Sequence, residues 1–331
     1  MRPLALTMGE PAGIGGEIAL QAWLRRAEGI PPFYLIDDPD RLGRLARKLG
    51  WDVKLRVIDD RAMAVGVFAE ALPVTPLGDA ATARPGHPDP GDQRLVLRAI
   101  DTAVADVRAG RAAALVTNPI NKDALYRAGF RHPGHTEYLA ELAGSSEPAV
   151  MMLAGPQLRV VPVTIHLALR DAIAVLSSEA IIHAGRVVDA SLRRDFAIAA
   201  PMIAIAGLNP HAGEAGGLGR EDIDIVAPAV AALREAGIDA RGPLAADTMF
   251  HAEARRGYDA ALCMYHDQAL IPIKTLDFDG AVNVTLGLPF VRTSPDHGTA
   301  FDIAGQGIAR PDSLIAALKL AASMAARRAK H

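Results

Sequence analysis

The sequence predicts an α/β protein whose core is a mostly parallel sheet covered by helices. Short, uniformly apolar runs alternate with longer stretches of helical periodicity, and loops rich in Gly, Pro or Asn separate them. Runs this short and this apolar are typical of strands buried on both faces of a parallel sheet. The chain has 331 residues, enough for two lobes, which we place at 1–130 plus 300–331 and at 131–299.

Each expected element is marked by its own pattern. The apolar runs that predict strands are, in chain order, 32–36, 112–117, 160–165, 203–208, 260–265 and 282–286. Apolar residues at helical spacing predict helices at 95–109, 222–236 and 313–328. The segment 73–90 is rich in Pro and Gly with little periodicity, which indicates a long loop, a hinge-side connection or a surface excursion.

Composition excludes several classes of protein. Hydrophobic residues make up 50% of the chain and charged residues 22%, which is typical of a globular protein and not of a disordered one. Lys and Arg number 35 against 38 Asp and Glu, so the net charge of −3 offers no overall attraction to nucleic acid or to an anionic membrane. The longest apolar stretch, 196–208, is interrupted by Pro201 and is too short to span a membrane.

Cysteine usage and the N-terminal segment favour a cytoplasmic protein. The single cysteine, Cys263, permits no intrachain disulfide and no cysteine-based metal cluster, as expected in a reducing compartment. The chain reaches Gly9 and Glu10 before the apolar core of a signal peptide could develop.

Three of the ten histidines share an unusual position. His166, His211 and His266 each lie at, or just beyond, the carboxyl end of a predicted buried strand. In open α/β sheets this is the edge where ligands bind. Three neutral imidazoles suit a divalent cation such as zinc and leave coordination positions open for substrate oxygens. Each histidine alone is better explained as a hydrogen-bonded loop residue, so it is the position shared by all three, with Asp267 directly after His266, that favours a metal site.

A second set of residues has the chemistry of an anion site. Lys274, Asn283 and Arg292 lie along a stretch that is otherwise apolar or loop-like, and they offer charged and neutral donors to phosphate or carboxylate. His135 and Thr136 stand at a predicted helix start, where Thr can cap the helix and free backbone N–H groups can meet an anion. The alternatives are solvated surface charges and a plain N-cap with a neighbouring histidine.

Two glycine-rich turns, GEPAGIGGE and HAGEAGGLGRED, lack the spacing of known nucleotide-binding fingerprints. Neither matches G-x-G-x-x-G or the phosphate-binding loop, which argues against a Rossmann domain and against an ATPase. The turn TNPINK carries Lys122 near a helix start, where it could face a cleft or simply lie on the surface.

Longer motifs carry a family resemblance over essentially the whole chain. They are GEPAGIG at 9–15, GHTEYLAE at 134–141, VTIHLALRD at 163–171, GLNPHAGE at 207–214, GPLAADTMF at 242–250 and MYHDQALIPIK at 264–274. In this order they resemble the 4-hydroxythreonine-4-phosphate dehydrogenase family of pyridoxal 5'-phosphate biosynthesis. Departures from the family pattern at Met8, Gly16, Asn118 and Ala168 remove no ligand or substrate contact, but they leave cofactor preference and fine substrate choice open.

The resemblance implies roles for particular residues. It assigns the metal to His166, His211 and His266. It assigns substrate contacts to His135, Thr136, Lys274, Asn283 and Arg292, so that the second lobe carries most of the site. It also implies lobes like those of isopropylmalate and isocitrate dehydrogenases, and a homodimer. The active site would lie in the interlobe cleft at the dimer interface, with metal ligands from both chains.

The implied reaction is a metal-dependent, NAD- or NADP-linked oxidation of 4-phosphooxy-L-threonine at its C3 hydroxyl. The 3-oxo acid would then decarboxylate to 3-amino-2-oxopropyl phosphate. Zn²⁺, Co²⁺ and Mg²⁺ are candidate metals, and the residues that contact the nicotinamide cofactor are not identified. Asp247 and Asp267 are the candidate catalytic bases, because each adjoins a site motif, but either could serve only to orient a neighbour.

Two alternatives remain open. A dehydrogenase for another four-carbon phosphorylated hydroxy acid, threonate or erythronate 4-phosphate, would use the same metal and anion residues. A non-catalytic, metal-dependent binding protein on the same scaffold would also keep them.

Overall fold

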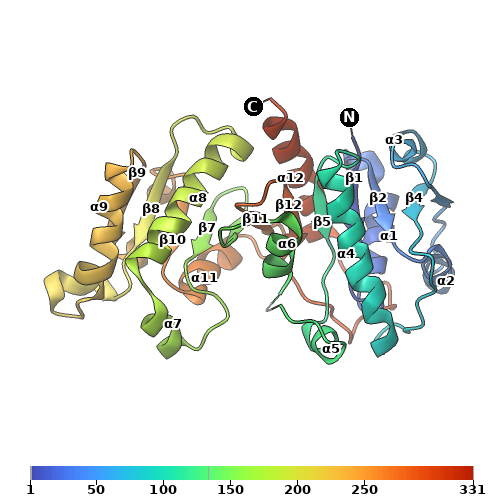
Figure 1. Ribbon diagram of the computed structural model, residues 1–331, viewed down its shortest axis with the longest axis horizontal. Coiled ribbons are helices and arrows are strands. Elements are labelled where there is room, and N and C mark those ends of the chain that lie inside the picture. Colours follow the sequence, from blue (N-terminus) through green and yellow to red (C-terminus); the bar gives the residue numbers. More distant parts are fainter. Residues whose placement is uncertain (1, 133, 331) are drawn as a thin grey trace. The chain divides into compact units, whose positions relative to one another are not determined.

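The computed structural model describes residues 2–132 and 134–330, and its backbone divides into two compact units. Unit 1 comprises Met1–Pro148 and Leu288–Ala326, and unit 2 comprises Ala149–Gly287 and Arg327–His331. In each unit helices cover a set of strands, as Figure 1 shows, so the predicted α/β class is confirmed. The lobe limits near residues 130 and 300 stay a prediction.

The strands of unit 1 are all parallel to their neighbours, in the order β3-β4-β2-β1-β5-β12. They are β1 (Leu4–Thr7), β2 (Phe33–Ile36), β3 (Leu55–Val57), β4 (Leu72–Thr75), β5 (Leu115–Thr117) and β12 (Arg292–Pro295). The helices are α1 (Gly15–Leu24), α2 (Pro39–Leu49), α3 (Met63–Val67), α4 (Gln93–Arg108), α5 (Lys122–Arg127), α6 (His135–Ala143) and α12 (Asp312–Arg328), the last ending in unit 2. Every residue of β1, β2, β4, β5 and β12 is buried, as expected for strands covered on both faces.

Helix α2 has a clear start and a clear end. The Asp38 carboxylate caps it by accepting from the Asp40 N–H at 2.8 Å, and Pro39 occupies the first helical position. The helix ends at Gly50, whose φ of 68° is the left-handed conformation that glycine adopts without strain. Arg47 and Lys48 lie in the last turn, where positive charge is favourable.

The strands of unit 2 follow the order β11-β6-β7-β10-β8-β9. They are β6 (Val150–Ala154), β7 (Arg159–Pro162), β8 (Met202–Ala206), β9 (Asp239–Leu244), β10 (Ala260–Cys263) and β11 (Val282–Leu286). The helices are α7 (Leu169–Val175), α8 (Ser178–Phe196), α9 (Ala227–Glu235), α10 (Ala252–Arg255) and α11 (His266–Leu276). Strand β6 is antiparallel to β7 and β11, while β7, β10, β8 and β9 are parallel to one another.

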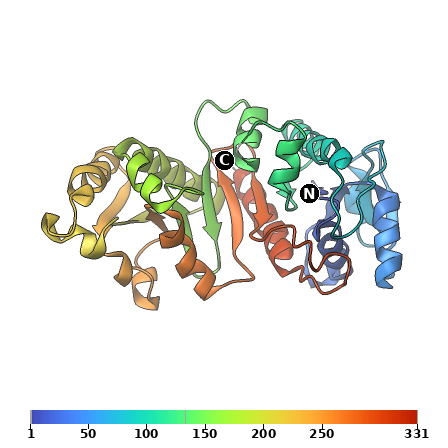
Figure 2. The ribbon, with the colours of Figure 1, turned by 90° about the horizontal axis from the view of Figure 1, so that it is seen from below.

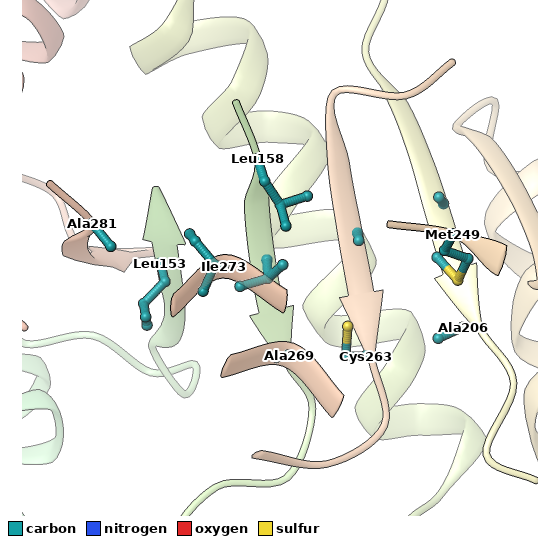
Figure 3. Close-up of a cluster of buried hydrophobic side chains, with 11 residues drawn as sticks. Leu153, Leu158, Ala206, Met249, Cys263, Ala269, Ile273 and Ala281 are labelled. Atoms are coloured by element: carbon teal, nitrogen blue, oxygen red, sulfur yellow. The ribbon is translucent and has the colours of Figure 1, made fainter. Parts of the chain in front are cut away.

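Alternation along the strands gives unit 2 a core on each face of its sheet. Leu153, Cys263 and Ala206 point to the face that α11 covers with Ala269 and Ile273 (Figure 3). Their neighbours along each strand point to the opposite face, which α8 covers, as Figure 2 shows. This two-sided burial explains why β6, β8 and β10 are apolar at every position.

The structure confirms the six predicted strands and corrects two details of the helices. The predicted helix 222–236 begins with a π-helical turn, Asp222–Val226, and becomes α-helical only as α9. The stretch interpreted as apolar or loop-like, which carries Lys274, begins within helix α11, and this helix continues through Pro272 to Leu276 because its buried face packs on β7 and β10. Among the described residues, none of the helices has the length and apolarity needed to cross a membrane.

Candidate functional site

The sheet of unit 2 brings the three predicted metal-binding histidines to one edge. Strands β7, β10 and β8 are adjacent and parallel, so their carboxyl ends lie side by side. His166 follows β7, His266 follows β10 and His211 follows β8. Residues 45 and 55 positions apart in the sequence therefore share an edge because of strand order, not because of any local motif.

Two of the three histidines are in direct proximity. The ring centroids of His166 and His266 lie 5.8 Å apart, and both rings line a cavity of about 270 Å³. Thr164, Leu169, Tyr265 and Asp267 also line this cavity. Asp267 Oδ1 lies 2.7 Å from Nδ1 of His266, which orients that ring and leaves Nε2 available as a ligand. Paired imidazoles with a carboxylate behind one of them are a donor set suited to Zn²⁺ or Co²⁺.

His211 lies in a strained segment of backbone. From His211 to Ala215 every φ is positive, between 44° and 80°, in the left-handed conformation that costs most residues about 1–2 kcal/mol each. The Asp222 carboxylate, only 1% exposed, holds the entry to this segment by accepting from the N–H groups of Leu208 and Asn209 at 2.7 and 3.0 Å. Gly207 precedes the segment and is required there, since a Cβ would lie 2.8 Å from the Cα of Ala212.

The described part of one chain assembles no group of three His, Cys, Asp or Glu side chains able to hold a metal ion. His211 is exposed and does not line the cavity of His166 and His266. Asp247 is also exposed, in a 3₁₀ turn (Ala246–Thr248) that contacts the turn carrying His211. Two of the predicted ligands are therefore gathered in the single chain, and the third stands on the same sheet edge.

Unit 1 holds a separate buried cluster around Arg292, the first residue of β12. Arg292 is 3% exposed and donates to Thr117 Oγ1 from Nη2 at 2.6 Å and from Nε at 3.2 Å. Nη2 also lies 3.4 Å from Nδ1 of His135, the first residue of α6. The other ring nitrogen of His135, Nε2, is buried without a hydrogen-bond partner. A buried nitrogen without a hydrogen-bond partner indicates a position where a bound ligand can supply that partner.

Burial and charge set the protonation of this cluster. Burial lowers the pKa of His135 well below its ordinary value, and the nearby cations Arg292 and Lys122 lower it further. Burial also lowers the pKa of Arg292 to about 10, so the guanidinium stays charged at neutral pH. A neutral imidazole beside a buried guanidinium is an environment that attracts an anion.

The start of α6 differs from the expectation for Thr136. The N-cap is Gly134, without a side-chain cap, so Thr136 lies inside the first turn and does not cap the helix. The correction follows from the backbone, because His135 already has helical geometry. Without a capping side chain, the first N–H groups of α6 remain available to a ligand.

The remaining two predicted substrate residues lie in unit 2. Lys274 is on α11, with Nζ 5.2 Å from the ring centroid of Phe278. Asn283 is on β11, and its Oδ1 is buried without a hydrogen-bond partner. Arg292, His135 and Thr136 therefore belong to one unit, and Lys274 and Asn283 to the other.

Sequence reasoning missed two residues that shape these sites. Thr117 ends β5 and was hidden within an apolar strand, although a hydroxyl at a strand's carboxyl end is a detectable signal. Asp222 was counted as an ordinary helix start, and no sequence signal distinguished it from a surface carboxylate.

Comparison with known proteins decides the family. A family model described as pyridoxal phosphate biosynthetic protein PdxA matches residues 30–321. The chain belongs to the PdxA family. A 4-hydroxythreonine-4-phosphate dehydrogenase from Bradyrhizobium diazoefficiens is 59% identical to it, over 98% of this chain and 97% of that protein.

Solved structures agree with this PdxA membership. A 4-hydroxythreonine-4-phosphate dehydrogenase from Klebsiella pneumoniae aligns with a TM-score of 0.88 and 41% identity, covering 98% of this chain and all of that one. A terephthalate 1,2-cis-dihydrodiol dehydrogenase from Burkholderia xenovorans LB400 aligns with a TM-score of 0.65 and 29% identity, covering 97% and 98%. A dehydrogenase named for a different substrate therefore has a similar fold. For this reason the substrate of this chain must be argued from the residues of its site and not from the fold.

Proposed function

We propose that this PdxA chain oxidises 4-phosphooxy-L-threonine at C3 with NAD or NADP, in a metal-dependent reaction that ends in decarboxylation. The observation that supports it most is the near-complete alignment, at 59% identity, with a protein named for that activity. The paired imidazoles of unit 2 and the buried anion cluster of unit 1 are the groups that such a substrate requires.

His166 and His266, with His211, would hold the divalent cation. Bound there, the cation would supply Lewis-acid polarisation of the C3 hydroxyl and of the ketone formed from it. Asp267 would fix the tautomer of His266 through the 2.7 Å contact with Nδ1. Asp247 and Asp267 remain the proposed acceptors of the hydroxyl proton, and Asp267 is the one that lines the cavity with the histidines.

Arg292, His135, Thr136, Lys274 and Asn283 would bind the charged ends of the substrate. In unit 1, Thr117 holds the guanidinium of Arg292 in place, so that it offers a fixed positive charge. In unit 2, the buried Oδ1 of Asn283 would accept a substrate donor. Bound NAD or NADP would supply the hydride acceptor for oxidation at C3, and the 3-oxo acid would then lose CO₂.

A homodimer with ligands from both chains is part of this proposal. Large apolar side chains on α7 and just before it are exposed: Leu167 is 49% exposed, Leu169 57% and Val175 56%, and the first two line the cavity of the histidine pair. An apolar patch of this kind next to an incomplete site is typical of a surface that another subunit covers. A cytoplasmic location also belongs to the proposal and agrees with the single buried cysteine.

Steady-state rates on a substrate panel test the proposal. We expect NADH or NADPH absorbance to rise with 4-phosphooxy-L-threonine, and to rise much less with threonate or erythronate 4-phosphate. Faster turnover of either acid would assign the chain to that reaction. A flat absorbance trace with every substrate, despite bound metal, would instead support the non-catalytic binding protein.

A further inference from the structure

A second cavity, of about 140 Å³, lies in unit 1 and is lined by cationic side chains. Its walls come from the turn after β1, from α2, and from the loop that follows β4. Arg41, Arg44 and Lys48 line it from α2, and Arg84 lines it from the loop. None of the described lining residues is acidic. The cavity contains neither the histidines nor the Arg292 cluster of the proposed active site.

The positive charge of this cavity is only partly balanced. Arg41 is buried, and Asp37 neutralises it through contacts at 2.5 and 3.0 Å. Arg44 is 3.8 Å from Asp38, a distance too long for a strong ion pair. Lys48 and Arg84 take part in none of the ion pairs formed by the described residues. About two positive charges are therefore left to face the cavity.

The backbone that presents these cations is held in place before any ligand arrives. Asp92 accepts from the N–H groups of Thr82 and Ala83, the residue before Arg84, at 2.8 to 3.0 Å. Two residues after Arg84, the N–H of Gly86 donates to Ala12 O at 2.8 Å. A site fixed in this way loses little conformational entropy when it binds.

The positions of the other two cations, Arg44 and Lys48, are fixed by helix α2 and by the packing around Gly305. Arg44 and Lys48 are four residues apart on α2, so they project from the same side of the helix. Gly305 packs so closely here that a Cβ on it would lie 2.7 Å from Pro85 and 3.0 Å from Lys48 Nζ. Glu17 fixes Gly305 in turn, by accepting its N–H at 2.8 Å.

We propose that Arg44, Lys48 and Arg84 form a binding site for a phosphate group. The cavity is smaller than the roughly 300–1,000 Å³ of sites that enclose a whole ligand, so it suits one charged group of a larger molecule or a free anion. Arginine forks and an ammonium group arranged around a small volume match the several acceptor oxygens of phosphate. The phosphate could belong to the dinucleotide of the proposed dehydrogenase, in which case the inference rests on that function, or to a free phosphate.

Calorimetric titration of the full-length, metal-loaded protein tests this site with NADP, NAD and inorganic phosphate as probes. The variants are Arg84→Gln and Lys48→Gln, and the control is Arg47→Gln, an exposed residue of the same helix that does not line the cavity. Phosphate titrations are repeated in the Arg292→Ala background, which removes binding at the other anion cluster.

We expect Arg84→Gln and Lys48→Gln each to raise the dissociation constant of at least one of the three probes about tenfold or more. Arg47→Gln should leave the dissociation constants of all three unchanged. A loss for NADP alone assigns the site to a phosphomonoester of the cofactor. A loss for both dinucleotides assigns it to the pyrophosphate. A loss for inorganic phosphate alone assigns it to a free anion.

Equal dissociation constants for wild type and for the Lys48→Gln/Arg84→Gln double variant, with all three probes, would overturn the inference. Binding is measured here without turnover. An inactive chain that binds phosphate at this cavity would therefore contradict only the proposed function, and an active chain with unchanged binding only this site.

Discussion

Burial decides the charge of His135, and that charge links stability to pH. Its pKa is lowered well below 6.5 in the folded chain, so on acidification the unfolded chain takes up this proton first. Above about pH 6.5 both states leave the ring neutral and it contributes no pH dependence. Below that value the folded state loses up to about 1.4 kcal/mol of stability for each pH unit, until the folded pKa is reached.

Replacing the ring isolates this contribution. Urea unfolding at pH 7.5 and pH 5.5 should show a smaller acid destabilisation in His135→Gln than in the wild type, since glutamine cannot titrate. The other histidines are common to both proteins and cancel in the comparison. Equal losses of unfolding free energy in the two proteins would show that His135 protonates normally.

Thr117 is expected to act through Arg292. Thr117→Val keeps the shape of the side chain but removes the hydroxyl that accepts two bonds from the guanidinium. We expect a loss of about 1.5–3 kcal/mol in unfolding free energy and a higher KM for the phosphorylated substrate, with KM for the cofactor little changed. Thr75→Val is the matched control, because Thr75 also ends a buried strand and its hydroxyl is buried without a partner. A KM shift of the same size in both variants would argue against the role of Thr117.

At the scale of elements, the turn after β8 is predicted to depend on Asp222. Asp222→Ala removes the acceptor for two N–H groups and leaves five left-handed residues without their anchor. We expect metal affinity to fall about tenfold or more, and proteolysis within 207–222 to accelerate. Asp224→Ala, two positions away on the exposed surface, should change neither. Unchanged metal affinity in Asp222→Ala would show that the turn holds His211 without this carboxylate.

The sequence was most informative for elements whose pattern depends on burial alone. Residues 260–265 were predicted as a strand and contain β10, because a short run buried on both faces carries no polar side chain. Helix α11 was missed because Pro272 and the following polar residues suggest a loop, whereas packing on the sheet maintains the helix. The π-turn at Asp222 was equally invisible, since its carboxylate serves a turn thirteen or fourteen residues earlier.

At the scale of the whole molecule, the order of strands in the sheet brings His166 and His266 together, which their separation in the sequence could not predict. Nothing local relates His166 to His266, yet their strands are neighbours and their rings lie 5.8 Å apart. The rule that ligands bind at carboxyl ends of parallel strands therefore predicted this pair from the sequence. Whether His211 joins them within one chain or from a second chain leaves no trace in residue patterns.

Mixing inactive subunits tests the proposed sharing of metal ligands. His166→Ala, His211→Ala and His266→Ala should each be inactive, and pairwise mixtures should form heterodimers. If two ligands come from one chain and the third from its partner, two of the three mixtures recover activity, to about one quarter of the wild type. The mixture that stays inactive identifies the two histidines from the same chain. Heterodimers that recover nothing in any mixture would place all three ligands within one chain.

The most direct test of the central claim is NAD(P)H formation from 4-phosphooxy-L-threonine by one preparation, assayed as isolated, after chelation and after metal is restored. We expect turnover by the isolated protein, loss of turnover as measured metal content falls, and recovery with Zn²⁺, Co²⁺ or Mg²⁺. Full activity in protein shown to be free of metal would contradict a metal-dependent oxidation.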